Sequence, residues 1–163
     1  GIEALVIGIG ININTKNYPS ELINKATSLY LETNKTFDLE VLKDDLRPFL
    51  EEMVKLIRKE YRFSESPIEK VWDNEGDQLV AFRRRDLLFI FNFNGEKSFT
   101  DYGILVKKGV YNVVLNTDAK EFGGFGFADD TIEHHTIASH LKNKEWLQLY
   151  IPARSALVLR RKD

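Results

Sequence analysis

The spacing of hydrophobic positions changes near the middle of the chain. Before about residue 61 the apolar residues follow a strand-like run and then a helical spacing, whereas after residue 68 they alternate with polar residues. A period of 3.6 indicates helix and a period of two indicates strand. We therefore predict an α+β chain, in which a short α/β segment of one strand plus helices (residues 1–64) is joined to an antiparallel β-sandwich (residues 68–163).

The first predicted element is a strand that contains two glycines. Residues 3–13, EALVIGIGINI, are apolar with little alternation, as in a strand buried on both faces. Gly8 and Gly10 invite a nucleotide-binding interpretation, but Ile13 stands where the dinucleotide fingerprint needs a third glycine. From the residues alone, the glycines thin the strand so that either a ligand or another element can lie against it.

Two helices are predicted to follow. Pro19 and Ser20 open a short helix that reaches about Thr33. Apolar residues then recur every three or four positions between residues 39 and 61, which predicts a long amphipathic helix with Asp38 as its N-cap. Pro48 is expected to kink this helix or divide it in two.

The second half is predicted to be a series of short strands. QLVAFR and LLFIFNF read as strands joined by a turn at residues 84–86, and VYNVVLN, WLQLYI and ALVLRR read as three more. Alternation places Tyr111, Val113 and Leu115 on one face. Short strands separated by turn signals are typical of a β-sandwich.

Composition excludes several classes of function. The 163 residues carry a net charge of −2, which gives no field to attract nucleic acid, and neither a basic run nor a long apolar run suggests a membrane. There is no cysteine, so disulfides and thiolate chemistry are excluded, which fits a reducing compartment. We expect a cytoplasmic protein that uses no cofactor.

No group of residues forms a self-sufficient catalytic site. His134 and His135 are adjacent, so on a strand they face opposite sides, and we predict no metal site. The acidic pairs at residues 44–45 and 51–52 fit the solvated face of the long helix. Residues 83–85, all arginine, fit a charged hairpin turn. We therefore predict no activity for this chain by itself.

The first half carries three stretches that match a known family: GIGININ, YPSELINKATSL and LRPFLEEMVKLIRKEY. Over residues 4–61 the chain resembles the second half of the catalytic core of biotin–protein ligases. The glycine strand lines the biotin and adenylate pocket in that family, so the resemblance implies ligand-binding roles for Gly8, Gly10 and Asn12. The family's basic glycine-rich loop, WPND segment and lysine-bearing strand are not found here, so ligase activity does not follow from the resemblance.

The second half carries VAFRRRDLLFIFNFNGEKSFTDYGILVKKGVYNVVLNTDAKEFGGFGFADD and WLQLYIPARSALVL. Residues 68–163 resemble the C-terminal all-β domain of 1,4-α-glucan (glycogen) branching enzymes along nearly their whole length. The chemistry of those enzymes resides in a (β/α)₈ barrel, which does not fit into this chain. The resemblance implies an accessory domain that packs on a catalytic barrel and contacts α-glucan. Phe125 and Phe127 replace a histidine and an arginine of the family pattern.

The stretch EFGGFGF alternates aromatic residues with glycine in a predicted loop. Gly123 and Gly124 are expected to take positive φ and let a turn pass close to other backbone. The rings of Phe122, Phe125 and Phe127 can either form a small core under the loop or project as an interaction patch for glucose units or a second copy of the chain. We expect Phe122 to point inward and Phe125 or Phe127 to be exposed.

Three functions remain as hypotheses. The favoured one is a non-catalytic accessory β domain whose partners are an α-glucan or a missing catalytic domain, with self-association as a further possibility. The second is a biotin–protein ligase remnant that needs a partner chain to complete its pocket, and the third is a structural fusion module. A natural or engineered fusion at residues 62–68 is our leading explanation for two unrelated resemblances in one chain.

Overall fold

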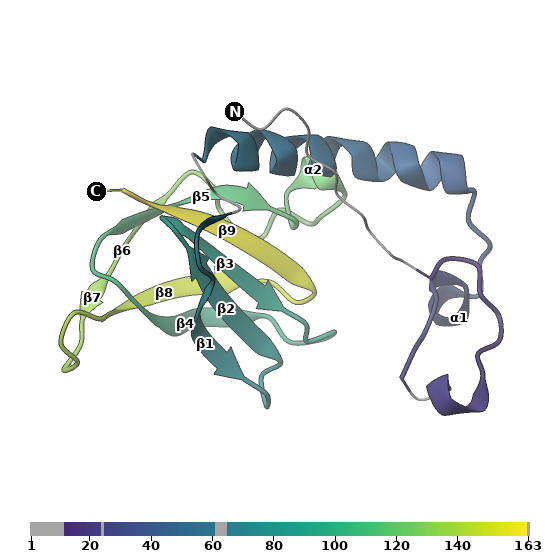
Figure 1. Ribbon diagram of the computed structural model, residues 1–163, viewed down its shortest axis with the longest axis horizontal. Helices are drawn as coiled ribbons and strands as arrows, with labels where there is room; N and C mark the ends of the chain where they lie inside the picture. Colours follow the sequence, from purple (N-terminus) through teal and green to yellow (C-terminus); the bar gives the residue numbers. More distant parts are fainter. Residues whose placement is uncertain (1–11, 24, 61–64, 163) are drawn as a thin grey trace. The chain divides into compact units, whose positions relative to one another are not determined.

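The computed structural model describes residues 12–23, 25–60 and 65–162 (Figure 1). The chain divides into two compact units, Gly1–Val54 and Lys55–Asp163. The strand predicted over residues 3–13 lies almost wholly outside the described residues. The predicted domain boundary also includes residues outside this range, so it stays a prediction.

The first unit contains short helical elements where one continuous helix was predicted. A 3₁₀ helix, η1, spans Ser20–Leu22, and the α-helix α1 spans Leu29–Thr33. The prediction of one helix up to Thr33 is therefore wrong. Ser28 explains the break, because its backbone is extended (φ −137°, ψ 162°) and its side chain caps α1 by accepting the Leu31 N–H at 3.2 Å.

The long amphipathic helix is confirmed as α2, Leu39–Lys59. Asp38 begins it as predicted, since one carboxylate oxygen accepts the backbone N–H of Glu40 at 2.8 Å and of Val41 at 3.3 Å. The helix continues through Pro48, so it is not divided there, and the kink expected as the alternative stays a prediction. Strong helix formers on both sides of the proline, among them leucine, glutamate and arginine, favour continuation.

The second unit is an antiparallel β-sandwich, which confirms the predicted fold class. Its strands are β1 (Glu69–Asn74), β2 (Leu79–Arg84), β3 (Leu87–Asn92), β4 (Phe99–Val106), β5 (Val110–Asn116), β6 (Glu133–His135), β7 (Ile137–Ala138), β8 (Glu145–Ile151) and β9 (Ser155–Lys162). One sheet has the order β1-β2-β3-β9-β5-β6 and the other has the order β4-β8-β7 (Figure 1).

The core lies between these two sheets. The six-stranded sheet contributes buried residues such as Ala81, Ile90 and Leu159, and the three-stranded sheet contributes Ile104 and Leu147, each of these 0% exposed. Inward residues alternate with outward ones along the strands, as the period of two predicted, except at the register shifts in β1, β4 and β5. The described residues contain no helix long and apolar enough to cross a membrane.

One predicted face is corrected by a bulge in β5. The register with β9 shifts between Val113 and Leu115, so that Val113 pairs with Leu159 and Leu115 pairs with Val158. Leu159 belongs to the core between the sheets and Val158 points to the opposite face of its strand. Tyr111 and Val113 therefore share a face, while Leu115 lies on the other one, because a bulge adds one residue to the alternation.

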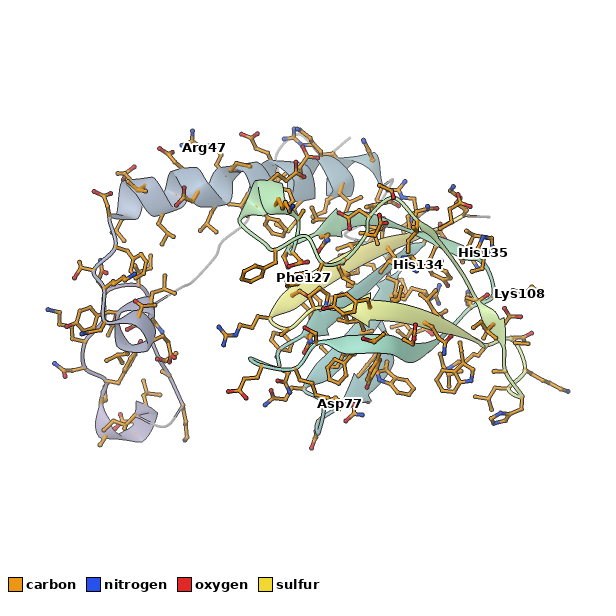
Figure 2. The ribbon with its side chains drawn as sticks, turned by 180° about the vertical axis from the view of Figure 1, so that it is seen from behind. Arg47, Asp77, Lys108, Phe127, His134 and His135 are labelled. Carbon is orange, nitrogen blue, oxygen red and sulfur yellow. The ribbon has the colours of Figure 1, made fainter. Side chains whose placement is uncertain are left out.

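The turn between β1 and β2 is fastened by Asp77, which is labelled in Figure 2. Its carboxylate accepts hydrogen bonds from Asn74 Nδ2 at 2.8 Å and Tyr102 Oη at 3.0 Å, and it pairs with Lys97 Nζ at 3.1 Å. The bonds from Lys97 and then Tyr102 hold the pKa of Asp77 below its ordinary value.

We expect Asp77 to make stability depend on acidity. Because its folded-state pKa is lowered, its contribution is fully present above the unfolded-chain pKa of about 3.9 and is lost as the pH falls through the folded-state pKa. Urea unfolding of the wild type and Asp77→Asn, repeated from pH 6 down to pH 2.5, measures this difference. An equal loss of stability with acidity in both proteins would contradict the assignment.

Candidate functional site

The loop that follows β5 is built on two buried polar side chains, Asn116 and Asp118. Asn116 Oδ1 accepts the backbone N–H of Asp118 at 2.8 Å, and Asn116 Nδ2 donates to Asp130 Oδ1 at 2.8 Å. Burial is the main cause of the raised pKa of Asp130. One amide thereby joins the start of the loop to its end.

The Asp118 carboxylate organises the rest of the loop. Oδ1 accepts the backbone N–H of Phe125 at 3.0 Å, and Oδ2 accepts the N–H of Phe127 at 2.6 Å and of Ala128 at 3.2 Å. The backbone carbonyl of Asp118 also accepts the Gly126 N–H at 2.7 Å. Asp118 is 6% exposed, so these bonds are shielded from water and fix the loop conformation.

The glycines of this loop have different roles. Gly123 ends a 3₁₀ helix, η3 (Lys120–Phe122), with φ 82°, and Gly126 has φ 69°. A Cβ on Gly124 would lie 2.2 Å from the backbone carbonyl carbon and oxygen of Asp118. The expected positive φ is thus found at Gly123, whereas Gly124 is needed for the close approach of two backbone segments.

The three phenylalanines divide as expected. Phe122 is half-buried, while Phe125 is 74% exposed and Phe127 is 64% exposed. The rings of Phe125 and Phe127 stack on each other with centroids 5.5 Å apart and an interplanar angle of 14°. Their exposure is confirmed, and their role in binding stays a prediction.

The exposed rings border a hollow of about 360 Å³. Its other wall comes from two turns of the sandwich, which contribute Gly95, Ser98 and residues 152–155. Arg154 Nε donates to the Gly95 carbonyl at 2.7 Å, and Ser98 Oγ accepts the Ala153 N–H at 3.0 Å. These bonds tie the two turns together, so both walls of the hollow are fixed.

The two sides of the hollow differ in chemistry. An apolar ring pair stands on one side, and a hydroxyl and a guanidinium stand on the other, in an open hollow. Such a mixture fits a ligand with apolar faces and polar edges. The carboxylate of Asp118 already accepts three N–H groups, so it serves the loop structure.

His134 and His135 are not among the residues that line this hollow. Gly8 and Gly10 lie outside the described residues, so their pocket role stays a prediction. Asn12 is exposed, and its backbone carbonyl accepts the Leu29 N–H at 3.0 Å. His134 and His135 lie on β6, where His134 is partly buried and His135 is exposed (Figure 2). Within the described residues no group of three or more histidine, aspartate or glutamate side chains could hold a metal ion.

The organising pair Asn116 and Asp118 was missed by the sequence interpretation. A signal was available, because NTD at the end of a predicted strand is typical of a turn in which side chains bond to nearby backbone. The second wall of the hollow had no such signal. Ser98 and Arg154 come from turns far from the loop in sequence, and only the folded sandwich brings them beside it.

The fold and the loop define an all-β accessory-type domain, and the comparisons with known proteins identify its family. Residues 71–162 match the model of the alpha amylase C-terminal all-beta domain, and the chain belongs to this family. The 1,4-alpha-glucan-branching enzyme of Saccharomyces cerevisiae is 46% identical over 92 residues, which are 55% of this chain and 13% of that enzyme.

Other relatives carry the same name. The 1,4-alpha-glucan-branching enzyme of Yarrowia lipolytica is 44% identical over 97 residues, covering 55% of this chain and 14% of that enzyme. That of Aspergillus oryzae is 40% identical over 109 residues, covering 65% of this chain and 16% of that enzyme. The chain thus matches a small part of each relative. The resemblance of the first half to biotin–protein ligases is not supported by these matches.

Proposed function

We propose that the β-sandwich is a non-catalytic accessory domain of the glucan-branching type, which contacts α-glucan through Phe125 and Phe127. The observation that carries this proposal is the fixed loop that displays the two stacked rings beside a hollow of about 360 Å³. Exposed apolar patches usually mark interaction surfaces, and a sugar ring offers an apolar face for stacking. The names of the relatives support α-glucan as the ligand.

Rigidity favours this use of the loop. A loop already held by the Asp118 carboxylate loses little conformational freedom when a ligand binds, so less of the contact energy is spent on ordering it. The Arg154 guanidinium and the Ser98 hydroxyl line the opposite wall of the same hollow. Both groups can form hydrogen bonds with sugar hydroxyls. The wall with the two phenylalanines would contact the face of a sugar ring, and the polar wall would contact its edge.

The domain is also proposed to pack on a catalytic barrel, as its family resemblance implies. An apolar surface suited to a protein partner is present on β2, β3 and the turn after them. Phe82 stacks on Phe91 at a centroid distance of 5.6 Å, and Phe91 stacks on Phe93 at 5.9 Å. Phe93 is 68% exposed, so this ladder of rings reaches the surface.

Affinity electrophoresis in gels that contain glycogen tests the glucan contact. The full chain is expected to be retarded, and Phe125→Ser/Phe127→Ser is expected to weaken the apparent affinity strongly. A ring that buries about 50 Å² of apolar surface contributes roughly 1 kcal/mol, or about fivefold for each ring. Phe93→Ser is the matched control, because it removes an equally exposed ring that does not line the hollow.

Two results would contradict the proposal. One is migration of the wild type that does not change with glycogen concentration. The other is an equal loss of retardation in Phe93→Ser and in the double variant, which would indicate non-specific stickiness. Sedimentation velocity on the same proteins identifies self-association, the rival use of the two rings, as a concentration-dependent species that the double variant loses.

A further inference from the structure

A second cavity lies at the opposite end of the sandwich. It has a volume of about 210 Å³ and opens where β4 ends, where β1 and β5 begin and where the chain turns into β8. Val71, Leu88, Leu105 and Val106 form its apolar part, and the ion pair between Glu69 and Arg83 also lines it. Leu88 and Val106 are 1% and 4% exposed, so the cavity reaches the edge of the core.

The mouth of this cavity is positively charged. Lys107, Lys142 and Lys144 line it and are exposed, and within the described residues none of the three forms an ion pair. The neighbouring Lys108 differs, since its Nζ lies 3.5 Å from Glu145 Oε1. Three uncompensated cations at one opening are notable in a chain whose net charge is −2. They create a local field that attracts anions.

The two lysines of the turn before β8 are held in place. Ser139 Oγ donates to the Lys144 carbonyl at 2.5 Å and accepts the Leu141 N–H at 3.1 Å. Asn143, between Lys142 and Lys144, has φ 62°, the left-handed conformation that tightens the turn. The backbone positions of the two ammonium-bearing residues are therefore fixed before any ligand arrives.

We propose that this cavity binds a small amphipathic carboxylate, with its aliphatic tail between the sheets and its carboxylate among the three lysines. A sugar phosphate fits less well, because polar side chains of the lining are already engaged: Glu69 and Arg83 pair with each other, and Tyr111 Oη donates to the Lys107 carbonyl at 2.8 Å. The volume lies below the roughly 300–1,000 Å³ of drug-sized sites, which favours a short chain.

Isothermal titration calorimetry of the full chain with hexanoate, octanoate, octanol and glucose 6-phosphate tests the proposal. Octanoate is expected to bind best, with each additional methylene strengthening the affinity by roughly fourfold. Lys107→Gln/Lys142→Gln/Lys144→Gln is expected to weaken octanoate by about tenfold, the combined effect of three exposed charge contacts.

The control removes the same charge elsewhere. Lys25→Gln/Lys35→Gln/Lys59→Gln changes three exposed lysines that do not line the cavity, and it should bind octanoate like the wild type. Equal weakening in the two triple variants would overturn the site. Octanol binding as tightly as octanoate would overturn the role of the lysines, and an affinity that does not depend on chain length would overturn the role of the cavity. Glucose 6-phosphate binding as tightly as octanoate would overturn the ligand class.

Discussion

Replacement of Asp118 by alanine is expected to release the loop after β5 and to lower the free energy of unfolding by about 3 kcal/mol or more. The substitution removes the acceptor of three backbone N–H groups, those of Phe125, Phe127 and Ala128. Hydrogen bonds to a charged group contribute about 1.5–3 kcal/mol each, and donors that stay buried without a partner add a further penalty. Urea unfolding followed by circular dichroism measures the change.

Asp129 provides the matched control, because it is an exposed aspartate in the same loop. Its carboxylate accepts from the N–H and hydroxyl of Thr131, at 2.8 and 2.6 Å, and joins no distant part of the loop. Asp129→Ala should therefore change stability by about 0.5 kcal/mol or less, as surface substitutions usually do. If both variants are equally stable, Asp118 does not organise the loop.

The same variant links stability to the proposed function. If the Phe125–Phe127 pair binds α-glucan because the loop is fixed, Asp118→Ala should reduce glycogen retardation even under conditions in which the sandwich stays folded. Both rings are still present in this variant, so any loss reports the cost of ordering the loop on binding.

The strands of the sandwich could be predicted because each is a local pattern. In LVAFRR and LLFIFN, inward and outward positions alternate, and the turn between these strands contains Arg85 at φ 56°. Asp38 was predictable for a similar reason, since an N-cap bonds to the next few residues of its own helix. Patterns of this kind depend on near neighbours and survive without knowledge of the fold.

The errors arose where one residue overrides a repeating pattern or where distant segments meet. A single bulge between Val113 and Leu115 moved Leu115 to the other face of its sheet. Ser28 begins a separate helix, α1, by offering its own hydroxyl to the Leu31 N–H, where one continuous helix was predicted. The hollow beside Phe125 could not be predicted, because Arg154 reaches it through the pairing of β8 and β9 with strands far away in sequence.

Gly124→Ala is expected to destabilise the β-sandwich by about 3 kcal/mol, the upper part of the usual range for overpacking. The added Cβ would lie 2.2 Å from the carbonyl carbon and oxygen of Asp118 and 2.4 Å from its Cα. These are backbone atoms, so no side chain can rotate away and the chain itself must move. That movement would also disturb the hydrogen bonds that the Asp118 carboxylate accepts from Phe125 and Phe127.

Gly123→Ala separates this steric effect from the conformational cost of losing a glycine. Gly123 has φ 82°, which an alanine adopts at a cost of about 1–2 kcal/mol, but nothing lies within 4 Å of an added Cβ there. Sequence reasoning assigns the two neighbours the same role, whereas the structure predicts that Gly124→Ala is the more damaging change. Chemical denaturation of the two variants side by side measures which one loses more stability. A larger loss of stability for Gly123→Ala would mean that backbone conformation, not the contact with Asp118, requires glycine in this loop.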